Sequence, residues 1–118
     1  MHKIAPEIFR QRLLIEGFYD LKVDEEVIKK FFAELTNELN LKAYGEPIIF
    51  SPEGMGKEDN QGYDAFIPLI DSGISLYVWT SSKFFSLIIF TCKSFDRDLA
   101  IEFTKKFFKV EKFESQDF

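Results

Sequence analysis

Two stretches of the chain repeat apolar residues at the three- and four-residue spacing of an amphipathic helix. Residues 24–41 show this spacing most clearly, and their apolar positions are Val27, Ile28, Phe31, Phe32, Leu35 and Leu39. Asp24 is a favourable N-cap residue, and the acidic residues after it suit the positive end of the helix dipole. A second helix is predicted over residues 96–108, with an apolar face of Leu99, Ala100, Phe103 and Phe107.

Other stretches have the composition or the alternation of β-strands. Residues 74–79 alternate between the two sides of a strand, and residues 84–91 are almost wholly apolar, which predicts a strand buried on both faces. Further strands are expected at residues 12–19, 47–50, 63–70 and 110–113. Pro68 argues against a central place for its strand, and the glycines, proline and charges of residues 51–62 predict a loop.

The predicted order of elements is β-α-β-β-β-β-α-β, and it indicates an α+β fold. Two helices on one face of a mainly antiparallel sheet would form a two-layer sandwich. The length of 118 residues and the absence of a repeat or linker indicate a single domain over residues 1–118. The face of the sheet opposite the helices would need cover, which a second copy of the chain would provide.

Aromatic residues are unusually frequent for so short a chain: 15 Phe, 4 Tyr and 1 Trp. Each buried ring removes about 150–250 Å² from water, so one small core does not easily hide them all. Some rings are therefore expected to face a partner subunit or a pocket. The alternative is a large apolar core with a few exposed rings, and the sequence leaves both interpretations open.

Charge and cysteine content limit the possible partners and the compartment. A formal net charge of −5 argues against binding to nucleic acid and to anionic membranes. No apolar run approaches the roughly 18 residues of a spanning helix, and the N-terminus has no signal-peptide pattern. With one cysteine no internal disulfide can form, so we expect a cytoplasmic protein.

Few residues offer familiar catalytic or metal-binding chemistry. The only histidine is His2, which excludes the usual Ser-His-Asp and Cys-His arrangements, and no metal site is expected. No glycine-rich phosphate-binding loop is present. Taken singly, Asp71-Ser72-Gly73 is typical of a turn between strands, and Cys92 at the end of an apolar strand is typical of a small buried side chain.

Taken together, these two features resemble the prokaryotic S-adenosylmethionine decarboxylase family. In that family a Glu-Ser-His triplet opens a strand that continues Ile-Ser-Ile-His-Thr-Trp-Pro-Glu, and Phe-Thr-Cys closes the next strand. Here the matching runs are Asp71–Ser81, with the sequence DSGISLYVWTS, and Phe90-Thr91-Cys92. Upstream, Gln61–Ala65 (QGYDA) is similar to the family's Gln-Gly-Val-Ser-Gly. The resemblance extends over most of the chain but is specific only in residues 61–92.

The resemblance implies a self-processing, pyruvoyl-dependent amino-acid decarboxylase linked to polyamine synthesis. Ser72 would be the precursor of the pyruvoyl group, and cleavage of the Asp71–Ser72 bond would leave chains of residues 1–71 and 72–118. Cys92 would donate a proton during turnover. The implied substrate is S-adenosylmethionine, with arginine or ornithine as variants, and the implied assembly is a homodimer.

Several positions depart from the family pattern. The strand histidine of the family is Tyr77 here, the upstream serine is Asp64, and the triplet histidine is Gly73. A tyrosine with a pKa of about 10 is a poor base at neutral pH, so Asp64 together with Tyr77 would have to replace the missing imidazole. The family's Pro-Glu is Thr80-Ser81, which removes a carboxylate.

Three interpretations therefore remain open. The chain is a self-processing decarboxylase, or it is a non-processing paralog that binds a small ligand or regulates a partner. The third is a dimerisation module whose aromatic surface is its function. Only the third predicts that there is no pocket near Ser72 and Cys92.

Overall fold

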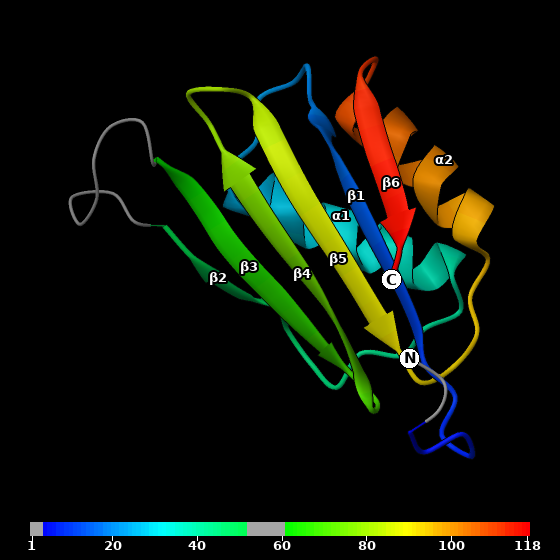
Figure 1. The fold of residues 1–118 in the computed structure, drawn as a ribbon. Helices are drawn as coiled ribbons and strands as arrows, with labels where there is room; N and C mark the ends of the chain where they lie inside the picture. Colours follow the sequence, from blue (N-terminus) through cyan, green and yellow to red (C-terminus); the bar gives the residue numbers. More distant parts are fainter. Residues whose placement is uncertain (1–3, 52–60) are drawn as a thin grey trace.

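The computed structural model describes residues 4–51 and 61–118, and these form two layers (Figure 1). One layer is a six-stranded sheet, and the other consists of two helices that cover one face of it. The elements in chain order are β1 (Gln11–Phe18), α1 (Glu25–Glu38), β2 (Ile48–Phe50), β3 (Gly62–Leu69), β4 (Ser72–Trp79), β5 (Phe84–Thr91), α2 (Arg97–Phe108) and β6 (Phe113–Asp117). The predicted α+β sandwich and the predicted order of elements are confirmed.

All paired strands run antiparallel, in the spatial order β2-β3-β4-β5-β1-β6. The edge strand β2 pairs only with residues 64–66 of β3, so Pro68 lies beyond the part of β3 that β2 covers. This position tolerates a residue without a backbone N–H. The last strand begins at Phe113, later than predicted, and the predicted loop lies mostly in residues 52–60, outside the described part.

Helix α1 begins at the predicted cap, Asp24, and α2 begins at an aspartate cap of the same kind, Asp96. The Asp24 carboxylate accepts a hydrogen bond from the Val27 N–H at 2.9 Å, and the Asp96 carboxylate accepts one from the Leu99 N–H at 3.0 Å. Each bond satisfies a backbone donor that the first turn of a helix leaves free. Lys109, in the left-handed conformation with φ 52°, ends α2.

The face that α2 buries differs from the predicted one. Its buried residues are Ala100, Ile101, Thr104 and Phe108, so of the predicted face only Ala100 is fully buried. The rings of Phe103 and Phe107 lie at the flank of α2, with centroids 6.1 and 5.1 Å from that of Phe31. These aromatic residues pack between the two helices, which is why their spacing alone gave a helical face rotated from the observed one.

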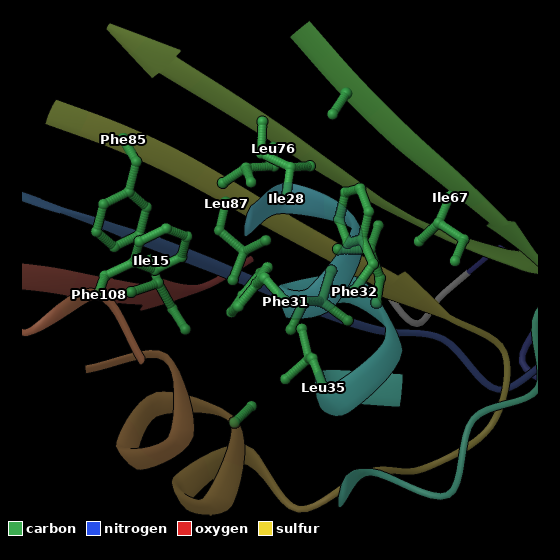
Figure 2. Close-up of a cluster of buried hydrophobic side chains, with 14 of the residues drawn as sticks. Ile15, Ile28, Phe31, Phe32, Leu35, Ile67, Leu76, Phe85, Leu87 and Phe108 are labelled. Carbon is green, nitrogen blue, oxygen red and sulfur yellow. The ribbon is translucent and has the colours of Figure 1, made fainter. Parts of the chain in front are cut away.

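The core lies between the helices and the sheet and is rich in aromatic rings (Figure 2). The ring centroid of Phe108 is 4.7 Å from that of Phe85 on the sheet and 4.7 Å from that of Phe31 on α1. All three side chains are fully buried. The three rings therefore connect both helices to the middle of the sheet.

Strand β5 is fully buried on the face toward the helices and only partly buried on the other, so the prediction of burial on both faces is wrong. Phe85, Leu87 and Ile89 face the helices and are fully buried, whereas Phe90 on the opposite face is 37% exposed. The run is apolar on both sides because the opposite face of the sheet, here called the open face, also carries apolar residues. Those exposed on it are Phe18, Ile48, Phe50, Phe66, Tyr77 and Phe90.

Replacement of Phe108 by Ala should test the central role of the aromatic stack. We expect a loss of about 3–5 kcal/mol in the free energy of unfolding, measured by chemical denaturation, because the ring leaves a cavity between α1, α2 and β5. Phe9→Ala is the matched control, since Phe9 is 52% exposed and should change stability little. Equal losses in both variants would contradict the assignment of the stack as the core.

Candidate functional site

Ser72 lies at the first position of β4, directly after the turn that joins β3 to β4. Leu69 and Ser72 are the last paired residues of this hairpin, so Ile70 and Asp71 form a two-residue turn. Asp71 has a φ of 54°, in the left-handed region that aspartate tolerates better than most residues. The bond proposed for cleavage therefore connects a tight turn to a regular strand.

Cys92 follows β5, and the pairing of β4 with β5 brings it to Ser72. Gly73 is opposite Phe90 in this pairing, so the start of β4 lies beside the end of β5. The backbone N–H of Cys92 donates a hydrogen bond to Ser72 Oγ at 3.0 Å. The two residues singled out in the sequence, 20 positions apart, are thus in direct contact.

Ser72 and Cys92 share a hollow of about 320 Å³ at this end of the sheet. Its other lining residues are Leu41, Lys42, Leu69, Ile70, Asp71 and Lys93. Leucine and isoleucine side chains supply apolar walls, and the charged groups are two ammonium groups and one carboxylate. This hollow contradicts the one expectation particular to a pure dimerisation module, which was the absence of a pocket beside these two residues.

A second hollow, of about 310 Å³, lies on the open face and also reaches Ser72. It is lined by Phe66, Asp71, Ser72, Gly73, Ser75, Ile88 and Phe90. Ser72 therefore borders two concave surfaces. One lies at the ends of strands β4 and β5, beside the residues that follow α1, and the other lies on the open face.

Phe66 occupies the space beside Gly73, a contact that was not predicted from the sequence. A Cβ atom built on Gly73 would lie 2.6 Å from both Cε1 and Cζ of the Phe66 ring. The family triplet has a histidine at the position of Gly73, and here the Phe66 ring would have to shift to admit one. The pairing of β3 with β4 explains this contact. Pro68 is directly opposite Gly73 and Phe66 is opposite Ser75, so Phe66 is the diagonal neighbour of Gly73 and its ring can reach it.

Asp64 and Tyr77 lie together, but away from Ser72. They are directly opposite each other in the β3–β4 pairing, and both are exposed on the open face. Tyr77 is five residues from Ser72, which corresponds to about 17 Å along a strand. Alternation also places the Ser72 side chain on the helix side of β4, opposite to that of Tyr77. Within one chain, the structure does not bring the two predicted base residues to the hydroxyl.

Within residues 4–51 and 61–118, no three His, Cys, Asp or Glu side chains are grouped so that they would hold a metal ion. In the same part of the chain, neither helix is long and apolar enough to cross a bilayer.

The fold defines the chain as a domain of the S-adenosylmethionine decarboxylase type. A sequence model of the S-adenosylmethionine decarboxylase family matches residues 15–118, and the chain belongs to that family. Among solved structures, the chain is similar to the crystal structure of the adenosylmethionine decarboxylase from Aquifex aeolicus. The TM-score is 0.72 at 14% identity, over 94% of this chain and 89% of that one, so this similarity supports the fold. A comparison with curated proteins finds no match.

The contact between Phe66 and Gly73 can be tested by the sign of a stability change. In a strand, Gly→Ala normally stabilises by about 0.5–1 kcal/mol. We expect Gly73→Ala to destabilise the wild-type chain, because the new methyl group overlaps the Phe66 ring, and to stabilise a chain that already carries Phe66→Ala.

The measurement is a double-mutant cycle by chemical denaturation, with a coupling of about 0.5–3 kcal/mol. Additive effects of the two substitutions would show that the ring does not restrict position 73.

Proposed function

We propose that this chain is a pyruvoyl-dependent amino-acid decarboxylase that cleaves itself between Asp71 and Ser72. The observation that carries the proposal is the hydrogen bond from the Cys92 N–H to Ser72 Oγ, which joins the two family motifs at a hollow. In line with the family, we propose S-adenosylmethionine as the substrate, a role in polyamine synthesis and a cytoplasmic location.

The Cys92 N–H suits the first step of self-cleavage. Ser72 Oγ would attack the carbonyl carbon of Asp71, the peptide C–N bond would break, and the hydroxyl proton would pass to the released nitrogen. The N–H donor stabilises the negative charge that develops on Oγ as its proton leaves. It also holds the hydroxyl in place, which lowers the entropic cost of reaching the geometry of attack.

The ester then has to eliminate. The proton on Cα of residue 72 leaves, the Cβ–Oγ bond breaks, and Asp71 departs as a carboxylate that keeps the oxygen. The enamine left on residue 72 takes up a proton at Cβ and becomes an imine. Water then replaces the nitrogen, which leaves as ammonia, so residues 72–118 begin with a pyruvoyl group. When present, this group supplies the electron-accepting carbonyl for loss of carbon dioxide.

Residues that line the hollow at Ser72 would also act during turnover. Leu41, Leu69 and Ile70 would exclude water around the reacting carbon. The Cys92 thiol, at the same hollow, would supply a proton to that carbon after carbon dioxide leaves.

The open face supports a homodimer in which two sheets pack face to face. Six large apolar or aromatic side chains are exposed on this one surface, which is more than single scattered residues would explain. A two-fold axis would cover the same residues on both copies. In such a dimer Asp64 and Tyr77 would face the second copy, so any part they take in processing would be in that copy.

A second candidate function is a non-processing paralog that binds a small ligand or regulates a partner. The observation that favours it is the separation of about 17 Å between Ser72 and the Asp64–Tyr77 pair. Without a base within reach, the hydroxyl would stay protonated and the peptide intact. The hollow would then still accept a ligand.

The mass of the purified protein separates the two candidates. We expect denaturing mass spectrometry to show two chains, residues 1–71 and 72–118, in place of one chain of 13.8 kDa. The smaller chain should begin with a blocked residue, and the sum of the two masses should reflect one water gained and one ammonia lost. Ser72→Ala should stay intact, and the matched control Ser75→Ala should cleave like the wild type. An intact wild-type chain after prolonged incubation would instead establish the non-processing paralog.

The dimer is tested by its dissociation constant in analytical ultracentrifugation. Phe50→Asp should raise this constant at least about tenfold, because each copy would bury an unpaired carboxylate at the interface. The control is Tyr44→Asp, which changes a similarly exposed ring outside the strands. If the wild-type protein sediments as a monomer at all concentrations, the open face is not a dimer interface.

A further inference from the structure

We propose that Gln11 is a positioning residue for the Ser72–Cys92 pair. It does not touch either residue through a hydrogen bond in the structure; it acts on the segment that carries Cys92. The proposal rests on the function proposed above insofar as that pair performs the cleavage.

The side-chain amide of Gln11 pairs with the backbone of Phe95 in both directions. Gln11 Nε2 donates to the Phe95 carbonyl at 3.0 Å, and the Phe95 N–H donates to Gln11 Oε1 at 3.1 Å. This is the pattern that two residues of neighbouring strands make through their backbones. The amide thus extends the β1–β5 pairing past Thr91, where the strand itself has ended.

A second contact fixes the start of the same segment. The hydroxyl of Thr91, a fully buried residue, donates to the Lys93 carbonyl at 2.6 Å. The Lys93 ammonium group in turn donates to the Asn40 carbonyl at 3.1 Å, near the end of α1. The segment between β5 and α2 is therefore held at its start by Thr91 and at its end by Gln11.

Cys92 lies between these two fixed points. Its N–H is directed at Ser72 Oγ only as long as the backbone around it keeps its orientation, since hydrogen bonds weaken steeply with angle. The segment has no regular secondary structure of its own. The loss of the Gln11 amide would leave the Phe95 N–H and carbonyl without these partners and would let the segment rotate about Thr91.

A purely structural role for Gln11 is the competing explanation. Phe95 immediately precedes Asp96, the N-cap of α2, so the amide also fixes the entry into that helix. A structural role alone would lower the stability of the whole chain. A positioning role also changes the environment of one particular amide, that of Cys92, and this difference can be measured.

The experiment compares amide hydrogen exchange at Cys92 by NMR in the wild type, Gln11→Leu and Gln11→Glu, each in its uncleaved form, because cleavage removes Oγ from residue 72. In Gln11→Leu we expect Cys92 exchange to rise roughly three- to tenfold, as for the loss of one hydrogen bond, with little change at Leu87 in the middle of β5. Ser72→Ala gives the exchange expected when the acceptor itself is absent. Gln116→Leu, the same substitution at an exposed position of neighbouring β6, should leave Cys92 as in the wild type.

Gln11→Glu adds a pH readout that a general loss of stability would not produce. A protonated glutamic acid can both donate to the Phe95 carbonyl and accept from its N–H, whereas a carboxylate can only accept. Protection of Cys92 in this variant should therefore return toward the wild-type value below about pH 4, the ordinary range of a glutamate pKa. Gln11→Leu should show no such recovery.

Cleavage is measured on the same variants, at temperatures equally far below each melting temperature. We expect Gln11→Leu to cleave more slowly by the same factor by which Cys92 exchange rises. Unchanged exchange at Cys92 would overturn the proposal, and so would raised exchange with unchanged cleavage. A wild-type chain that never cleaves would overturn the proposed function alone, because the exchange data would still decide whether Gln11 orients Cys92 toward Ser72.

Discussion

The stack of Phe31, Phe108 and Phe85 is the constraint on which the rest of the structure depends. It joins both helices to the centre of the sheet and so determines which face of each strand is buried. Side chains alternate along a strand, and a shift of one residue would turn every apolar side chain to the other face. With Phe85 directed into the core, the pairing of β5 with β4 on one side and β1 on the other has one favourable alignment.

That alignment places every feature of the candidate site. It brings the start of β4 to the end of β5, so that a serine at the beginning of one strand meets the residue after the other. The same alternation puts Gly73 under Phe66 and sends Asp64 and Tyr77 to the open face. The site is therefore assembled by the packing of side chains that take no part in the chemistry.

The sequence was sufficient for the elements, their order and the family, because these follow from local spacing and short motifs. Asp24 caps α1 as expected, and the motif residues Ser72 and Cys92 lie together. Contacts between distant residues were not accessible in this way. The pairing of Gln11 with Phe95 spans 84 positions, and no local pattern around a glutamine at the start of a strand predicts it.

The two wrong predictions have different physical origins. Strand β5 was expected to be buried on both faces because its run is apolar throughout, whereas this chain also places apolar side chains on an uncovered surface. The predicted face of α2 was rotated because Phe103 and Phe107 pack between the two helices. Spacing reports the geometry of one element, and it does not report which of two apolar faces meets a helix.

Because Ser72 borders two hollows, the proposed chemistry and the proposed dimer contact lie on different sides of the same residue. The hollow on the open face would be closed by a second copy of the chain, because Phe66 and Phe90 line it and belong to the exposed apolar surface. The other hollow lies at the ends of strands β4 and β5, contains Cys92 and is lined by Leu41 and Lys42 from the segment after α1. It lies outside the exposed apolar surface. A dimer formed through the open face would therefore shield one side of the Asp71–Ser72 peptide from water and leave the other side open to a small molecule. A serine at the first position of a strand can therefore border a proposed interface and a ligand site at once, because it lies beside the turn and beside both faces of the sheet.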